Sequence, residues 1–439
     1  EICACLVGSE MCIRDSFNGK PPHIKVMNKT ALDQYEEIVT DALKSCSAKL
    51  RKSFKTAFIQ LMILYMVLPR KINFTQMGRY SDSSEQRFRQ LFEREFDRMQ
   101  FNLFLMRQHF GESTRKAIAI DASYISKSGK KTPYIGKFWS GCASAMKRGL
   151  EILGIGIVDI DSRDCMMLCA EQTPDKAYLE KQGEEYNLVD WYLDVLRKYR
   201  DKLLDITRYI VADAWFSKAK FVGKACLPGF HVISRLRDDA ALWYSHDGVR
   251  TGKRGRPRIK GEKIDFKKLD LQRCEVLDIE GGRAYSVKAY SKAMKRNIKV
   301  VVHYAESGEH KIYFSTDLEM SDKDIIEYYR TRFQIEFCFR DSKQFTGLND
   351  CQARDLKKLD FAFNASPASV NIAKVMRQRY YPSLSIGLLK AYLSNTYMLK
   401  RIFSKSGMKP NRTFNAKLIK ELFLSLIHIS EPTRHAQIS

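Results

Sequence analysis

The stretch KAIAIDAS (residues 116–123) decides the fold class, because a helical sequence pattern gives way there to strands. Its apolar residues run together or alternate, as they do in a buried strand. Four similar runs follow: LEILGIGIVDI (150–160), DCMMLCAEQ (164–172), RYIVADAWF (208–216) and HVISRLRD (231–238). A helix over about 187–202 is expected between the third and fourth of these five runs. Three strands, a helix and further strands predict an α/β fold, with a mixed five-stranded sheet and flanking helices.

Upstream of this stretch, residues 30–110 are expected to be helical, because their apolar residues recur at three- and four-residue spacing. The apolar run FIQLMILYMVL (58–68) is far shorter than the roughly 20 residues that a membrane helix needs, so it is interpreted as a core helix.

Within this helical region, residues 72–97 have helix-turn-helix character. A short helix over 75–80, a serine-rich turn over 81–84 and a second helix over 85–96 are predicted. Arg87 and Arg89 on the second helix are candidate DNA-binding residues, because a basic helix can enter a DNA groove. The alternative is a helical hairpin that only packs.

Downstream, a basic segment that contains glycine, TGKRGRPRIKGEK (251–263), precedes strand candidates at 284–291, 297–304 and 311–316. One long helix is then expected to begin after the N-cap Ser321 and to continue past Glu336 to about Phe345.

Composition restricts the class of function. The 439 residues include 75 Lys and Arg against 51 Asp and Glu, which gives a net charge of +24. With 44% hydrophobic residues the chain can bury a large core, which excludes intrinsic disorder. The positive excess favours a polyanionic partner over a merely solvated basic surface. The 11 cysteines include no C-x-x-C pair and are expected to be reduced thiols, and the 8 histidines form no zinc pattern.

The two terminal segments have an unusual relation to each other. LSLIHISEPTR (424–434) can be encoded by a DNA segment whose opposite strand encodes LVGSEMCIRD (6–15). We therefore interpret residues 1–16 and 424–439 as scars that resemble a sequencing adapter, with Met27 as the expected native start and an incomplete C-terminal helical region from 401 to 423. Residues 1–16 carry a net −2 and 424–439 carry none, so the remainder carries +26.

Two aspartates follow apolar runs. Asp121 and Asp213 each come where a predicted strand ends. Carboxylates at strand ends project into a shared cleft, where hard divalent metals can bind. A strand followed by Asp is otherwise often only a turn.

The helix after Ser321 adds four polar residues with the spacing Y-x2-R-x3-E-x6-K: Tyr329, Arg332, Glu336 and Lys343. In a continuous helix at about 100° per residue, they lie within about 60° of one face. A carboxylate flanked by cations and a phenol suits a metal-bound phosphodiester. The alternative is an ordinary surface pair between Arg332 and Glu336, with Tyr329 in the core.

These segments together resemble a known family. YRTRFQIEFCFRDSKQFTGLNDCQAR (329–354), IDASYISKSGKKT (120–132) and IVADAWFSK (210–218) are similar to the DDE transposases of bacterial insertion sequences that carry the YREK motif. The resemblance covers residues 30–400 in order and spacing.

The resemblance implies a ribonuclease-H-like catalytic core in which Asp121, Asp213 and Glu336 bind two Mg²⁺ ions, with Mn²⁺ able to substitute. Such enzymes cut at the inverted terminal repeats of their element and join the freed 3′-hydroxyl to target DNA. A hairpin intermediate is also implied, in which a flipped base stacks on an aromatic residue. The tryptophans considered for that role, with no choice among them, are Trp139, Trp215 and Trp243.

The resemblance also divides the chain. The expected parts are a helical DNA-binding region (27–112), the first part of the catalytic core (113–239), a β-rich insertion domain (240–317) and the second part of the core with the YREK helix (318–400). Within the insertion, Arg254 and Arg256 of RGRP resemble a minor-groove arm, with a solvated loop as the alternative. Tyr329, Arg332 and Lys343 are expected to hold DNA phosphates.

The implied partners are double-stranded DNA and a second copy of the chain in a synaptic homodimer, without a membrane, in the bacterial cytoplasm at the nucleoid. Two alternatives remain open. One is a ribonuclease-H-like nuclease or resolvase without strand transfer, and the other is a catalytically silent DNA-binding protein derived from a transposase.

Overall fold

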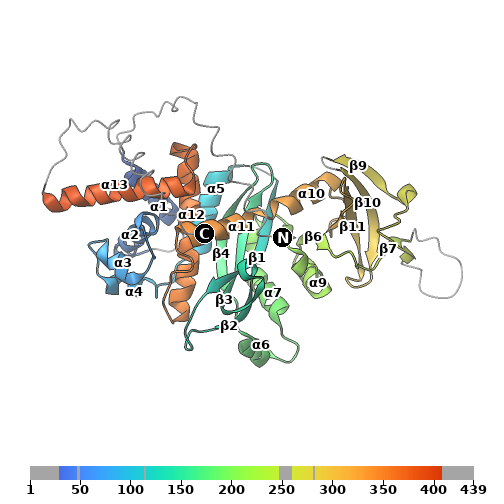
Figure 1. Cartoon of the computed structure of the whole chain (residues 1–439), viewed down its shortest axis with the longest axis horizontal. Coiled ribbons are helices and arrows are strands. Elements are labelled where there is room, and N and C mark those ends of the chain that lie inside the picture. The colour runs from blue at the N-terminus through green and yellow to red at the C-terminus, as the bar shows by residue number, and fades with distance from the viewer. Residues whose placement is uncertain (1–28, 47–49, 113–114, 247–259, 280–281, 408–439) are drawn as a thin grey trace, which may run out of the picture. The chain divides into compact units, whose positions relative to one another are not determined.

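The computed structural model describes residues 29–46, 50–112, 115–246, 260–279 and 282–407 (Figure 1). The chain divides into two compact units. Within the described residues, the first unit comprises 29–111, 123–152 and 339–407, and the second comprises 112–122 and 153–338.

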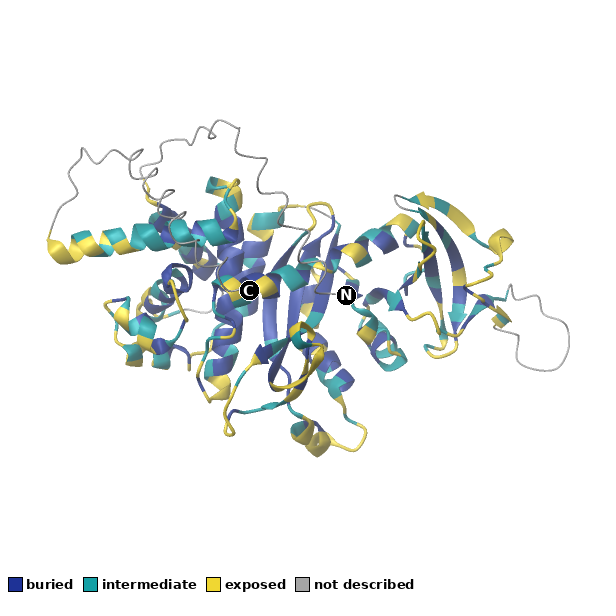
Figure 2. Ribbon diagram, viewed as in Figure 1, coloured by how far each residue is buried: buried dark blue, intermediate teal, exposed yellow. Residues whose placement is uncertain are grey.

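The first unit is mainly helical, as expected for its N-terminal part. Its helices are α1 (Ala31–Lys44), α2 (Lys52–Val67), α3 (Phe74–Arg79), α4 (Glu85–Leu91), α5 (Arg98–Phe110), α12 (Leu356–Tyr380) and α13 (Ile386–Ser406). Helix α12 is buried over most of its length (Figure 2). Phenylalanines pack around it: the rings of Phe92 and Phe361 stack 4.5 Å apart, and Phe58 meets Phe101 at 5.5 Å. The apolar run at 58–68 is therefore a core helix, as predicted.

Two short helices, α3 and α4, lie in the segment for which helix-turn-helix character was predicted. Each has a side-chain cap, because Asn73 accepts a hydrogen bond from the backbone of Gln76, and Ser84 accepts one from Arg87. The second helix is shorter than expected, since it ends at Leu91 and not at 96. Asp97 already caps the next helix, so the intervening residues form a turn.

The first unit also contains the hairpin of β2 (Gly136–Ser140) with the first half of β3 (Ala145–Asp159), joined by the 3₁₀ turn η3 (Gly141–Ala143). Strands β1 and β3 and helix α11 each have residues in both units.

The second unit is a mixed α/β structure with a large sheet. Its strands follow the order β3-β1-β5-β6-β12-β11-β10-β7-β8, with β4 beside β3 and β9 beside β10. The strand bounds are β1 (Lys116–Ser126), β4 (Asp164–Gln172), β5 (Tyr209–Ala212), β6 (His231–Leu236), β7 (Leu242–Ser245), β8 (Lys260–Lys263), β9 (Glu275–Ile279), β10 (Gly282–Ser291), β11 (Arg296–Ala305) and β12 (His310–Ser315).

The sheet differs from the predicted one in extent. The five expected strands are present as β1, β3, β4, β5 and β6, but β12 bonds to β6, so the sheet does not end at five strands. Strand β5 is also shorter than the apolar run at 208–216, because the chain turns into the 3₁₀ helix η4 (Ala214–Phe216) directly after Asp213.

The helices of the second unit are α6 (Lys176–Gln182), α7 (Leu188–Lys198), α8 (Arg200–Leu204), α9 (Ala219–Cys226), α10 (Asp322–Thr331) and the start of α11 (Gln334–Phe345), with the 3₁₀ turn η5 (Leu271–Arg273). The helix predicted at 187–202 is divided at Tyr199, whose backbone leaves the helical region.

The single helix predicted from Ser321 to about Phe345 is wrong, because α10 and α11 are separate. At the junction the backbone N–H of Ile335 bonds to the carbonyl of Arg332, and that of Glu336 to Phe333, which is the tighter three-residue spacing. The common 60° face predicted for the four YREK residues assumed a continuous helix, and the helix is interrupted between Thr331 and Gln334.

Some sequence predictions fall outside the described residues. These are the terminal segments 1–16 and 424–439, Met27, the C-terminal part of 401–423, and Arg254 and Arg256. Among the described residues, no helix is long and apolar enough to cross a membrane.

Candidate active site

Two parallel strands of the second unit bring Asp121 and Asp213 to the same level. The register of β1 and β5 pairs Ile120 with Ala212, and the next residue in the chain after each is an aspartate: Asp121 within β1 and Asp213 just after β5. Neighbouring strands lie about 4.8 Å apart, and register partners project to the same side of a sheet. The two aspartates are therefore neighbours, but the prediction that both end a strand is wrong for Asp121, because β1 continues to Ser126, whereas Asp213 directly follows the end of β5.

Strand β6, which pairs with β5, fixes the backbone of Asp213. Ser234 on β6 is fully buried and its hydroxyl donates to the carbonyl oxygen of Asp213 at 3.1 Å. The backbone N–H of Phe216 donates to the same carbonyl at 2.9 Å. Sequence reasoning missed Ser234, because only the pairing of β5 with β6 brings it near Asp213.

The break between α10 and α11 places Arg332 between two carboxylates. Its guanidinium lies 2.9 Å from Glu336 Oε1 and 3.9 Å from Asp121 Oδ2. The Arg332 side chain is only 11% exposed, while those of Asp121 and Glu336 are 22% and 33% exposed. The i,i+4 pair between Arg332 and Glu336 is thus present, and it is partly buried beside Asp121 of β1.

One arginine does not compensate this group of acids. Burial raises the pKa of Asp121 to about 7, against the effect of Arg332, and the charges of Glu336 and Asp213 raise it further. Burial also raises the pKa of Glu336, again against Arg332 and with a contribution from Asp213. The three carboxylates therefore repel one another across a partly desolvated space.

Tyr329 lies beside this group. Its ring is 5.2 Å from that of Tyr313 on β12, and the Arg332 guanidinium lies 5.8 Å from its centroid. Burial raises the pKa of its hydroxyl, and the charge of Asp213 adds to the shift. The phenol is therefore protonated near neutral pH and can donate a hydrogen bond.

The other predicted DNA-binding residues lie in the first unit or outside the described residues. Lys343 Nζ donates to Ser123 Oγ at 2.8 Å. Arg87 on α4 is exposed, whereas Arg89 pairs with Glu85 and lies 4.8 Å from the centroid of Phe74. Three of the four YREK residues, Tyr329, Arg332 and Glu336, lie in the second unit. The fourth, Lys343, lies in the first.

The donor set is chemically suited to a hard divalent cation, since three carboxylates supply only oxygen ligands and carry an uncompensated negative charge. Among the described residues, however, no group of three or more His, Cys, Asp or Glu side chains is close enough to hold a metal ion as the side chains lie. Arg332 stands between Asp121 and Glu336, and its buried Nε has no hydrogen-bond partner among the described residues.

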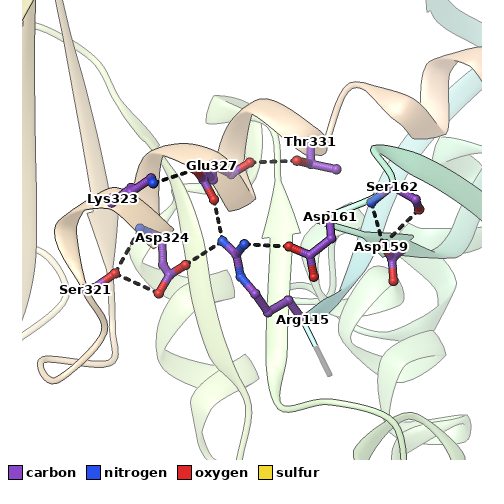
Figure 3. Close-up of polar contacts among 9 residues, drawn as sticks. All are labelled: Arg115, Asp159, Asp161, Ser162, Ser321, Lys323, Asp324, Glu327 and Thr331. Atoms are coloured by element: carbon purple, nitrogen blue, oxygen red, sulfur yellow. Dashed lines mark hydrogen bonds and ion pairs between the residues drawn. The ribbon is translucent and has the colours of Figure 1, made fainter. Parts of the chain in front are cut away.

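A second arginine cluster, which the sequence did not indicate, fixes the start of α10 (Figure 3). Arg115, just before β1, reaches Asp161 at 2.6 Å, Asp324 at 2.7 Å and also Glu327. Ser321 caps the same helix, because its hydroxyl accepts a hydrogen bond from the backbone N–H of Asp324 at 3.1 Å. Helix α10 is thus tied to β1 at its first turns, and the chain just after its last residue carries Arg332 to Asp121.

The structure separates the three tryptophans. Trp139 on β2 is 57% exposed, and Trp215 in η4 is 40% exposed, with the Lys218 ammonium 3.5 Å from its ring centroid. Trp243 on β7 is half-buried under Lys260.

The fold and this group of residues define a mixed α/β protein with an acidic residue within one strand and another just after the parallel strand beside it. Residues 160–366 match the family described as "Transposase DDE domain". The match supports a DDE transposase, an enzyme that acts on DNA. It includes Asp213, Arg332 and Glu336 and begins after Asp121. A comparison with curated proteins finds no match.

Proposed function

We propose that the protein is a YREK-type DDE transposase with a ribonuclease-H-like core, which cleaves DNA at the inverted terminal repeats of an insertion sequence and joins the freed end to target DNA. The observation that carries the proposal is the register of β1 and β5, which sets Asp121 beside Asp213. The family match over residues 160–366 supports the class.

Asp121, Asp213 and Glu336 are the proposed ligands for Mg²⁺, or for Mn²⁺ in its place. Divalent ions, when bound, would activate the attacking oxygen and stabilise the leaving oxygen of an in-line displacement. The carboxylates fit this role because together they are acidic, partly desolvated and compensated by one arginine.

Arg332 and Tyr329 have the proposed task of holding the phosphate that is attacked. The guanidinium can donate two parallel hydrogen bonds to phosphate oxygens, and the protonated phenol can donate another. Both groups are half-buried, so each has lost some rotational freedom before DNA binds. Lys343 has the same proposed task from α11.

Two further DNA contacts belong to the proposal. Exposed Arg87 on α4 suits a recognition helix, with Arg89 positioned by Glu85, and Arg254 and Arg256 are proposed to enter a minor groove. The proposed reaction proceeds through a DNA hairpin and requires a homodimer, at the nucleoid of a bacterial cell.

The test needs the DNA that flanks the reading frame, since a pair of inverted repeats there supplies the substrate. Labelled DNA with one such end is incubated with the full chain and Mg²⁺, and nicked, hairpin and joined products are separated. Asp121→Asn, Asp213→Asn and Glu336→Gln should each abolish nicking while DNA binding is retained. Normal nicking by any of the three would refute the ligand assignment.

Asp239→Asn is the matched control, because this exposed aspartate is distant in sequence from all three positions and pairs only weakly with Arg237. It should cleave as the unaltered protein does. Nicking without joined products would favour the nuclease alternative, and DNA binding without any nicking in Mg²⁺ or Mn²⁺ would favour the silent DNA-binding protein.

A further inference from the structure

The segment between Asp121 and Glu151 has an extreme charge composition. Residues 122–150 contain no Asp or Glu but six cations: Lys127, Lys130, Lys131, Lys137, Lys147 and Arg148. All of these except Lys127 are exposed, and none of the exposed five forms an ion pair with a described residue. A surface with this composition attracts a polyanion.

The β2–β3 hairpin of the first unit arranges part of this charge on one face. Its register pairs Lys137 with Arg148 and Trp139 with Met146. Residues directly opposite each other in an antiparallel pair project to the same side, so these four side chains share one face of the hairpin. The neighbouring residues of β2 on the opposite face, Phe138 and Ser140, are buried.

The centre of the outer face is apolar. Trp139 and Met146 are each 57% exposed, and both are among the most exposed large apolar side chains of the described chain. The hairpin end is coloured as exposed in Figure 2. An exposed aromatic side chain flanked by cations suits the face of a nucleic-acid base and its flanking phosphates.

The outer face has a rigid support. Gly149 follows Arg148, and a Cβ at this position would lie 2.6 Å from the carbonyl oxygen of Ile125 and 2.7 Å from the hydroxyl of Tyr124. That hydroxyl donates to the carbonyl oxygen of Arg148 at 2.7 Å. The base of the hairpin therefore presses against β1, and its outer face is held in place before any partner binds.

We propose that the outer face of the β2–β3 hairpin, formed by Lys137, Trp139, Met146 and Arg148, is a binding site for unpaired DNA. Trp139 stacks on an exposed base with Met146 beside it, and Lys137 and Arg148 contact the phosphates on either side. A second copy of the same face is a poor partner, because the two surfaces carry like charge. The inference rests on the proposed action on DNA. The β2–β3 hairpin would bind the DNA strand that becomes unpaired during that reaction.

The test measures binding of the full chain to a short fluorescent single strand and to a fully paired duplex of the same length, in EDTA, by anisotropy over a range of salt. Trp139→Ala should weaken binding to the single strand about tenfold and affect the duplex less, because a fully paired duplex offers no free base face. Trp139→Phe should retain most of the affinity.

The double variant Lys137→Ala/Arg148→Ala should lower the slope of log affinity against log salt by about 1.4 on the single strand, as expected when two phosphate contacts are lost. Leu227→Ala and Lys181→Ala are matched controls, since each removes one exposed apolar or cationic side chain elsewhere. Both should bind as the unaltered chain does. Equal thermal unfolding of all variants ensures that folding is not the cause.

Wild-type affinity of both hairpin variants for the two DNAs would overturn the inference while leaving the transposase proposal intact. Equal losses on single strand and duplex by Trp139→Ala would overturn the base-stacking assignment. An effect confined to anionic phosphatidylserine vesicles would make the face a membrane contact instead. Failure of the unaltered chain to bind any DNA would contradict the transposase proposal itself.

Discussion

Two aspartates of the second unit, Asp121 and Asp190, lie in environments of opposite electrostatic character. The Asp190 side chain is 10% exposed, yet it pairs with both Lys220 and Lys224, and its pKa is lowered to about 2, since these partners outweigh the effect of burial. The Asp121 side chain is 22% exposed, has one arginine at 3.9 Å, and its pKa is raised to about 7. Burial is the largest influence on both pKa values; at Asp190 two lysines outweigh it, whereas at Asp121 the single arginine does not.

The comparison separates a structural carboxylate from one that is suited to a ligand. Asp190 ties α7 to α9 and needs no further partner. Asp121 shares Arg332 with Glu336 and lies beside Asp213, so a divalent cation would complete its environment.

The largest effect is expected on catalysis. Asp121→Asn should reduce DNA end cleavage by at least about a thousandfold, comparable to the loss of a key group that stabilises charge in a transition state. Asp190→Asn should leave the rate per folded molecule unchanged. Single-turnover cleavage at saturating Mg²⁺ measures both. Equal losses by the two variants would erase the proposed distinction.

Arg332→Ala should destabilise the protein by about 3 kcal/mol in metal-free buffer, because it leaves Asp121 and Glu336 without their shared cation. Urea unfolding measures the change. The combination with Glu336→Gln should cost less than the sum of the single changes, since the two residues are in contact. Strict additivity would show that the pair is not coupled.

The pH dependence of stability should have opposite signs at the two aspartates. The folded-state pKa of Asp121 is above its unfolded value, so the wild type should lose stability relative to Asp121→Asn as pH rises from about 4 to about 7. The folded-state pKa of Asp190 is below its unfolded value, so the stability that it contributes should be present above about pH 4 and lost toward pH 2. The change in stability should be larger at Asp121 than at Asp190, because the pKa of Asp121 lies further from its usual value. Urea unfolding of the wild type, Asp121→Asn and Asp190→Asn across this pH range in EDTA measures both. Slopes of the same sign would contradict the assignment.

The smallest effect is expected at the exposed cluster in Figure 3. Arg115→Ala should cost about 1 kcal/mol of stability, because its partners remain hydrated. Arg115→Lys should lose less stability than Arg115→Ala, since lysine keeps the positive charge but not the planar guanidinium that can contact several carboxylates. Thermal unfolding at low and high salt should show the loss shrinking with salt. A loss as large as that of Arg332→Ala would show that exposure does not distinguish the two clusters.

Sequence periodicity was sufficient for most elements. The helical region before residue 111, the five apolar runs and the strands after residue 281 all correspond to elements of the expected type. The spacing of apolar residues shows which side of an element is buried, and this spacing distinguishes a helix from a strand. The division of the YREK helix at Arg332 was not predictable, because no proline or glycine marks it and only hydrogen bonds across the junction reveal it.

The candidate site was predictable in its residue types but not in its arrangement. Asp121 and Asp213 follow apolar runs in the sequence, yet only the strand register makes them neighbours. Ser234 and Arg115 act through contacts with residues far away in the chain, so no local pattern marks them. The exposed side of the β2–β3 hairpin likewise follows from its register, although the absence of acidic residues from 122–150 is visible in the sequence.

The most direct test of the central claim is calorimetric titration of Mn²⁺ into the metal-free protein, with Asp121→Asn and Asp190→Asn measured beside the wild type. We predict that the wild type and Asp190→Asn bind with the same affinity, while Asp121→Asn binds at least about tenfold more weakly, because it loses a charged oxygen ligand. Equal affinity of Asp121→Asn and the wild type would contradict the account.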